Sequence, residues 1–124
     1  MVWDDADRGE VEEVLSDQAQ LRDRIGSLDG DTRTLVTVYG EDAHLAVGGD
    51  SSTGLVVYAT FDNEVFHQLV TGTGGGDREV MVVAGGQPGR YPAKSVVPLR
   101  DAVTAAGTFA DDGRLDDRLT WVKQ

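Results

Sequence analysis

"TRTLVTVYGEDAHLAVGGDSSTGLVVYATFDNEVFHQLVT", residues 32–71, decides the fold of this chain. It contains four runs of strand length that are rich in β-branched and aromatic residues. A fifth run of the same kind, residues 78–85, follows a glycine-rich break. Short breaks join strands that are neighbours in a sheet, so the pattern predicts an antiparallel meander of five strands. The three breaks within the quoted stretch are 40–43, 48–53 and 61–63.

Helical patterns flank the predicted sheet. Residues 6–31 place apolar side chains at an approximate helical spacing, with glutamates in the first turns. Residues 98–113 predict a second helix, because Pro98 suits a first turn and Gly113 suits a C-terminal stop. Residues 118–124 predict a closing strand, and the first three residues predict a short edge strand.

This order of elements indicates the fold class. We expect an α+β protein with a mostly antiparallel five- to six-stranded meander sheet and two helices packed on one face. The 124 residues fit the usual size of one domain and contain neither a repeat nor a linker. We therefore expect a single domain, residues 1–124.

Composition limits the classes of function. The chain has no cysteine, which excludes disulfides and thiolate sites, and no apolar run approaches the ~20 residues of a membrane span. Its acidic N-terminus lacks a signal core, so we expect a cytoplasmic protein without membrane contact. The net charge of −11 disfavours nucleic-acid binding and favours a basic partner, although solubility alone explains it equally well.

The glycine-rich stretch at 72–77 raises the question of phosphate binding. No lysine follows its glycines, and Asp77 or Glu79 stands where a dinucleotide loop needs its last glycine. A strand pattern follows it, not the helix that would hold a phosphate at its N-terminus. The stretch therefore favours a hairpin turn.

No catalytic, cofactor or metal constellation emerges from the other residues. His44 and His67 lie in strand patterns without metal-ligand spacing, which favours histidines on a sheet face or an interface. No serine lies in a nucleophile elbow. We therefore expect a binding protein, not an enzyme, with no cofactor, no metal and no catalytic residue.

In a meander, alternate loops emerge at the same end of the sheet. The loops 40–43, 61–64 and 86–95 are thus expected at one end, where carboxylates and an aromatic side chain would favour a protein partner. An ordinary polar loop surface is an equally good interpretation. The candidate contact residues are Glu41, Asp42, Asp62, Glu64 and Tyr91.

Three stretches of the chain can be compared with a known family: "GLVVYATFD" (54–62), "YPAKSVVPLRDAVTAAGTFADDG" (91–113) and the tryptophan-containing "LTWVKQ" (119–124). They resemble the Imm1 family of bacterial immunity proteins. The opening, a helix pattern followed by "TLVTVYG", is similar to the start of that family too. Members often carry Arg-Pro before the tryptophan, whereas this chain has "GRLDDRLTW".

The resemblance implies an immunity protein that binds and neutralises a cognate polymorphic toxin, often one with a nucleic-acid deaminase domain. The five candidate contact residues would then meet a basic toxin surface, and no catalytic residues carry over from the family. Two alternatives remain open at this point. One is a small-molecule-binding or enzymatic α+β domain that uses the 72–77 loop, and the other is an acidic nucleic-acid mimic.

Overall fold

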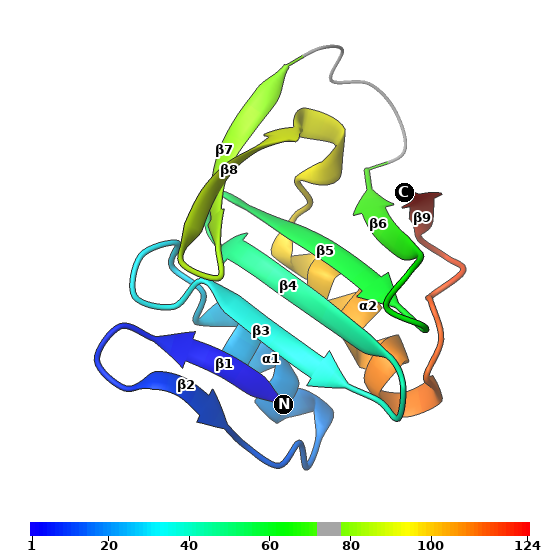
Figure 1. Ribbon diagram of the computed structural model, residues 1–124, viewed down its shortest axis with the longest axis horizontal. Coiled ribbons are helices and arrows are strands. Elements are labelled where there is room, and N and C mark those ends of the chain that lie inside the picture. The colour runs from blue at the N-terminus through cyan, green and yellow to red at the C-terminus, as the bar shows by residue number, and fades with distance from the viewer. Residues whose placement is uncertain (72–77) are drawn as a thin grey trace.

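A computed structural model describes residues 1–71 and 78–124, and it confirms the predicted fold class (Figure 1). The chain is an α+β protein with an antiparallel sheet, a separate two-stranded hairpin and two α-helices. No helix in the described part is long and apolar enough to cross a membrane. In chain order the elements are β1 (Val2–Asp5), β2 (Gly9–Glu12), α1 (Gln18–Gly26), β3 (Leu35–Tyr39), β4 (His44–Asp50), β5 (Gly54–Thr60), β6 (Phe66–Val70), β7 (Glu79–Ala84), β8 (Gln87–Pro92), the 3₁₀ turn η1 (Ala93–Ser95), α2 (Leu99–Asp112) and β9 (Thr120–Lys123).

The main sheet has the strand order β2-β1-β3-β4-β5-β6-β9, and every neighbouring pair is antiparallel. Its centre, β3 to β6, is the predicted meander. The predicted closing strand is present as β9 and pairs with β6. The predicted N-terminal edge strand is present as β1, but it lies inside the sheet because β2 covers its outer side.

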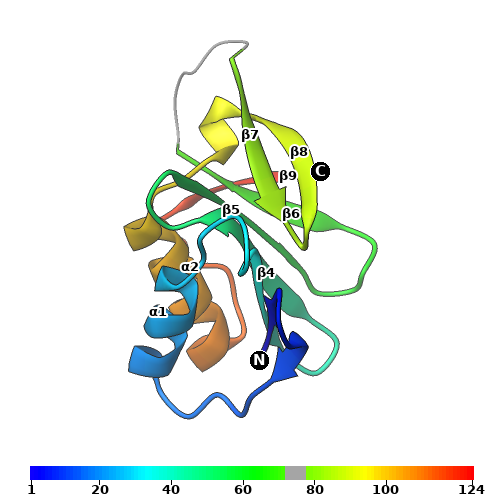
Figure 2. The same ribbon diagram turned by 90° about the vertical axis from the view of Figure 1, so that its left-hand side faces the viewer.

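The fifth predicted strand, β7, does not join the meander. It pairs with β8, and this hairpin crosses the sheet face opposite the helices (Figure 2). Glycines in β4 allow the backbones of β4 and β7 to approach each other closely. A Cβ on Gly48 would lie 2.4 Å from Ala84 Cβ, and one on Gly49 would lie 2.9 Å from Val82 Cγ1. The loop expected at 86–95 is therefore mostly strand β8.

The predicted first helix is much shorter than its pattern suggested. The structure forms the β1–β2 hairpin first, and α1 begins only after Asp17, whose side chain accepts a hydrogen bond from the Gln20 N–H. The helix expected from residue 6 is thus wrong for its first half. Trp3 explains the difference, because it is 5% exposed and fixes β1 against the core.

The hydrophobic core lies between the sheet and the two helices. The inward-facing residues of β3, β4 and β5 meet Leu21 and Ile25 of α1 and the alanine-rich face of α2. Small side chains on α2 let the helix lie close to the sheet. As predicted, α2 follows Pro98 and ends at Gly113, whose φ of 66° is left-handed. The opposite face of the sheet remains for the hairpin and for solvent.

Candidate partner-binding surface

Four of the five predicted contact residues lie at one end of the sheet. Glu41 and Asp42 stand on the loop between β3 and β4, and Asp62 and Glu64 stand on the loop between β5 and β6 (Figure 1). The cross-strand pair His44 and Thr60 holds these loops side by side. All four carboxylates are exposed. None of them takes part in an ion pair among the described residues, so their charge faces solvent uncompensated.

Asp62 differs from its three neighbours because it builds the turn. Its Oδ1 accepts hydrogen bonds from the backbone N–H groups of Val65 and Glu64, both at 2.9 Å. The Thr60 hydroxyl donates to the same oxygen at 3.3 Å. These donors, Val65 first, hold the pKa of Asp62 below its ordinary value. Asp62 thus shapes the loop on which Glu64 is presented.

Tyr91 is not at the acidic end, contrary to the shared-end prediction. It lies on β8, opposite Val80 in the hairpin, because β7 leaves the sheet before the chain can return to that end. Its register places it on the side of the hairpin that faces the sheet, together with Val82. The loop geometry predicted from a five-stranded meander is therefore wrong for this residue.

An aromatic cluster on the exposed sheet face adjoins the acidic loops. The His44 ring lies 5.9 Å from Tyr39, 6.5 Å from Tyr58 and 6.4 Å from Phe66, centroid to centroid. Tyr58 and Phe66 lie 6.2 Å apart. These are ordinary separations for tilted and edge-on aromatic pairs. We call Tyr39, His44, Tyr58 and Phe66 the aromatic cluster.

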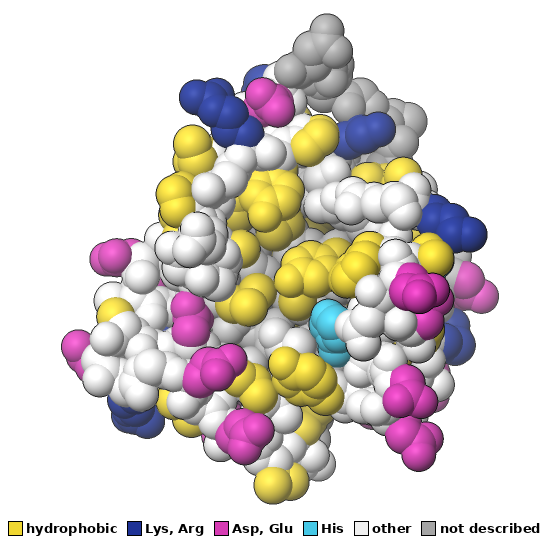
Figure 3. All heavy atoms as spheres, viewed as in Figure 1, with side chains coloured by type: hydrophobic (Ala, Val, Ile, Leu, Met, Phe, Trp, Pro, Cys, Tyr) yellow, Lys and Arg dark blue, Asp and Glu magenta, His cyan; other side chains and the backbone are white. Residues whose placement is uncertain are grey.

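Tyr91 approaches the aromatic cluster from the hairpin. Burial raises the pKa of Tyr58, and the neighbouring phenols of Tyr91 and Tyr39 raise it further. Figure 3 shows hydrophobic side chains in a band across this face, beside one histidine, with Asp and Glu side chains around its lower half. This face of the protein therefore brings aromatic side chains and carboxylates together, and Tyr91 joins it from strand β8 of the hairpin.

Sequence reasoning placed His44 on a sheet face correctly but missed the rest of the aromatic cluster. The missed residues are Tyr39, Tyr58 and Phe66. The alternation of side chains along the strands could have identified these three residues, since each of them alternates with residues that face the core. Tyr39 is 59% exposed, which is unusual for a large aromatic side chain and marks it as an accessible contact.

A cleft of about 490 Å³ opens beside Tyr39 at the acidic end. Its lining combines the loop 40–43 with Phe61 and the last turn of α2. The Phe61 ring is 38% exposed and lies 6.1 Å from the buried ring of Phe109. The cleft is therefore apolar where α2 and the sheet meet, and it is acidic where Glu41 and Asp42 line it.

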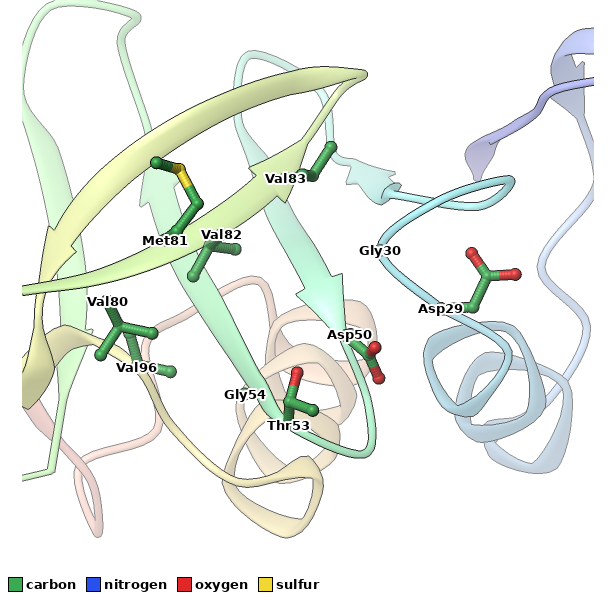
Figure 4. Close-up of a pocket in the computed structure, with 10 residues that line it drawn as sticks. All are labelled: Asp29, Gly30, Asp50, Thr53, Gly54, Val80, Met81, Val82, Val83 and Val96. Atoms are coloured by element: carbon green, nitrogen blue, oxygen red, sulfur yellow. The ribbon is translucent and has the colours of Figure 1, made fainter.

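A second cavity of about 270 Å³ lies between β7 and the β4–β5 turn. Figure 4 shows valines of β7, together with Val96, on one side of it and Asp29 and Asp50 on the other. Within residues 1–71 and 78–124, no lysine or arginine lines it. The Asp29 carboxylate already accepts hydrogen bonds from Asp31, Thr32 and Arg33, with Thr32 at 2.6 Å. The two acidic residues that line this cavity therefore disfavour an anion.

Two further questions from the sequence concern the glycine-rich stretch and a possible metal site. The glycine-rich stretch 72–77, on which the small-molecule alternative depends, lies outside the described part of the chain. Within residues 1–71 and 78–124, no group of three His, Asp or Glu side chains is placed to hold a metal ion.

Comparison with known proteins identifies the family. The chain matches the family model described as "Immunity protein Imm1" over residues 9–123. The matched segment begins at β2 and includes both helices, the hairpin and every later strand. A search among curated proteins finds no match. Because the matched segment spans nearly all of the 124 residues, the chain belongs to the Imm1 family of immunity proteins.

Proposed function

We propose that this chain neutralises a protein toxin by binding it in a one-to-one complex, with no chemical step of its own. Membership of the Imm1 family supports an immunity role, and an immunity role implies a toxin partner. One observation carries the proposed binding mode. Uncompensated acidic residues Glu41, Asp42 and Glu64 lie on two loops at one end of the sheet, and the exposed side chain of Tyr39 lies beside the first of these loops.

The charge of this surface favours a basic partner. A toxin that acts on nucleic acid needs cationic side chains along its substrate groove. An acidic inhibitor is attracted to such a groove and excludes the nucleic acid from it. In this proposal the toxin is a nucleic-acid deaminase, as the family resemblance implies. Residues 1–124 act as one inhibitory domain in the cytoplasm of the cell that produces the toxin.

An interface of ordinary size fits the proposed surface. Stable complexes bury roughly 800 Å² on each partner, with a few aromatic or arginine anchors contributing most of the affinity. Tyr39 and Tyr91 are the aromatic side chains that we assign to the centre of the contact. The carboxylates at its rim steer association and limit the choice of partner.

Co-expression with the product of the neighbouring gene, as the candidate toxin, tests the proposal. We expect cells that express the toxin alone to die and cells that express both proteins to grow, with the two proteins recovered as one complex. Death in both cultures, with no complex recovered, would contradict an immunity role.

Titration of the purified toxin separates binding from catalysis. We expect toxin activity to fall linearly and to reach zero at one equivalent of this protein. Full protection at a small fraction of an equivalent would show turnover and would contradict a stoichiometric inhibitor. Deamination of a cytosine- or adenine-containing oligonucleotide by the toxin alone tests the toxin class separately.

A further inference from the structure

We propose that the cleft at the acidic end receives an arginine side chain of the toxin. The cleft is the 490 Å³ space between the loop 40–43, Phe61 and the last turn of α2. This inference rests on the proposed function and names the chemistry of the group that the protein recognises.

The interior of the cleft suits the alkyl stem of a long side chain. Leu15, Val38, Phe61 and Ala110 contribute apolar lining, and buried Phe109 lies between α2 and the sheet. Long cationic side chains bury their methylene stems along such surfaces while the charged head remains near polar groups. A purely apolar occupant would leave Glu41 and Asp42, which also line the cleft, without a partner.

The charge of the cleft suits a cationic head. Glu41 and Asp42 line it, and neither belongs to an ion pair within the described residues. Helix α2 ends at the cleft with Gly113, and its last turn contains no basic residue. The negative end of the helix dipole therefore adds to the field of the two carboxylates. No lysine or arginine of the described chain lines the cleft.

The protein already binds its own arginine with the same combination of groups. The Arg24 guanidinium lies 4.6 Å from the centroid of the Trp3 ring, and its Nε donates to Glu13 at 2.7 Å. In that arrangement an aromatic ring and a carboxylate hold one guanidinium. The cleft is lined by the aromatic residues Tyr39 and Phe61 and by the acidic residues Glu41 and Asp42, and no arginine of the described residues lines it.

Arginine fits this arrangement better than lysine. Its planar guanidinium stacks on a ring and donates to two acceptors at once, whereas an ammonium group is a compact and strongly hydrated charge. Two acidic residues and two aromatic residues line the same cleft, so acceptors and aromatic groups are available within one site. We therefore assign the cleft to arginine.

Dissociation from the cognate toxin provides the first test. Neutralising the cleft with Glu41→Gln and Asp42→Asn should speed dissociation at least about tenfold, because loss of one partner of a desolvated charge pair acts mainly on the dissociation rate. Filling it with Ala110→Met should do the same without any change of charge. The matched control is Glu64→Gln, which removes one carboxylate at the same end but outside the cleft lining. We expect it to change only the association rate.

A small probe separates this inference from the proposed function. N-acetyl-arginine amide is titrated into the isotopically labelled protein, with N-acetyl-norleucine amide as the uncharged control. We expect weak binding, with amide shifts near Glu41, Phe61 and Ala110 for the arginine probe only. The Ala110→Met variant should lose these shifts.

If the wild-type protein binds the toxin but the cleft variants dissociate at the wild-type rate, the inference is overturned and the proposed function stands. If the toxin does not bind at all, the proposed function fails. In that case the arginine probe alone tests whether the cleft binds arginine. Amide shifts confined to the cleft support the inference, and their absence overturns it.

Discussion

At the scale of single residues, glycines determine where the β7–β8 hairpin lies. Gly48 has an ordinary backbone conformation, so its requirement for glycine is one of space. A Cβ there would come within 2.4 Å of Ala84 Cβ. The hairpin would have to move away from β4, and with it Tyr91, which it holds over the aromatic cluster.

We predict that Gly48→Ala lowers the free energy of unfolding by about 1–3 kcal/mol, the usual cost of forcing extra volume into a packed site. Urea denaturation measures the change. The matched control is Gly26→Ala at the end of α1, where no atom lies within 4 Å of the added Cβ. That variant should be neutral or slightly stabilised, because alanine is the better helix former. Equal destabilisation of both variants would show that close packing at Gly48 has no special role.

At the scale of elements, a carboxylate joins the N-terminal hairpin to α1. Glu13 accepts hydrogen bonds from Arg24 Nε at 2.7 Å and Nη2 at 2.8 Å, and from Trp3 Nε1 at 3.1 Å. The hydrogen bond from Arg24 is the main cause that lowers the pKa of Glu13 to about 2. This contact connects the segment after β2 with a helix that begins five residues later in the chain.

The pH dependence of stability follows from the sign of that shift. The pKa of Glu13 is lower in the folded state than its ordinary 4.5, so its stabilisation is complete above pH 4.5 and is lost as the pH falls toward 2. We predict that Glu13→Gln is less stable than wild type at neutral pH and that the difference narrows between pH 4.5 and 2. Thermal denaturation across this range is the measurement, with exposed Glu12→Gln as the control. A difference in stability between wild type and Glu13→Gln that stays constant with pH would contradict the prediction.

The elements also show what sequence alone could predict. The meander β3–β6 and helix α2 could be predicted because their signals are local. Apolar and polar side chains alternate along the strands, and Pro98 and Gly113 mark the two ends of the helix. The N-terminal hairpin does not, since the spacing of apolar residues there fits a helix as well. The contact of Trp3 with Glu13 and Arg24, which favours the hairpin, is a tertiary one. The departure of β7 likewise depends on glycines far away in the sequence.

At the scale of the whole molecule, local patterns predicted part of the candidate surface, and tertiary contacts determine the rest. Sequence placed Glu41, Asp42, Asp62 and Glu64 together, because two short loops of one meander share an end. It misplaced Tyr91, because a strand that leaves the sheet changes the position of everything after it. The role of Asp62 in its own turn also required the structure, since that role depends on the Val65 and Glu64 N–H groups.

The charge of the acidic end should control the rate of toxin association. Reversing Glu41, Asp42 and Glu64 to lysine changes the net charge from −11 to −5, because each reversal adds two charges. Asp62 is left intact because it builds the turn. We predict that association slows about tenfold or more at low salt and that the difference shrinks as salt screens the field.

A second variant tests whether the position of the reversed charges matters for the association rate, or only the net charge of the protein. Asp7 and Glu10 lie on the β1–β2 hairpin and Asp31 lies on the loop between α1 and β3, all outside the cleft lining. Reversing these three residues changes the net charge by the same amount. If the acidic end faces the toxin, this variant should slow association less than the first variant does at both salt concentrations, since salt screens charges more strongly the farther they lie from the contact. Stopped-flow kinetics at two salt concentrations measure both variants. Equal slowing of the two would mean that net charge acts without a localised surface, and no slowing in either would remove charge steering from the binding mode.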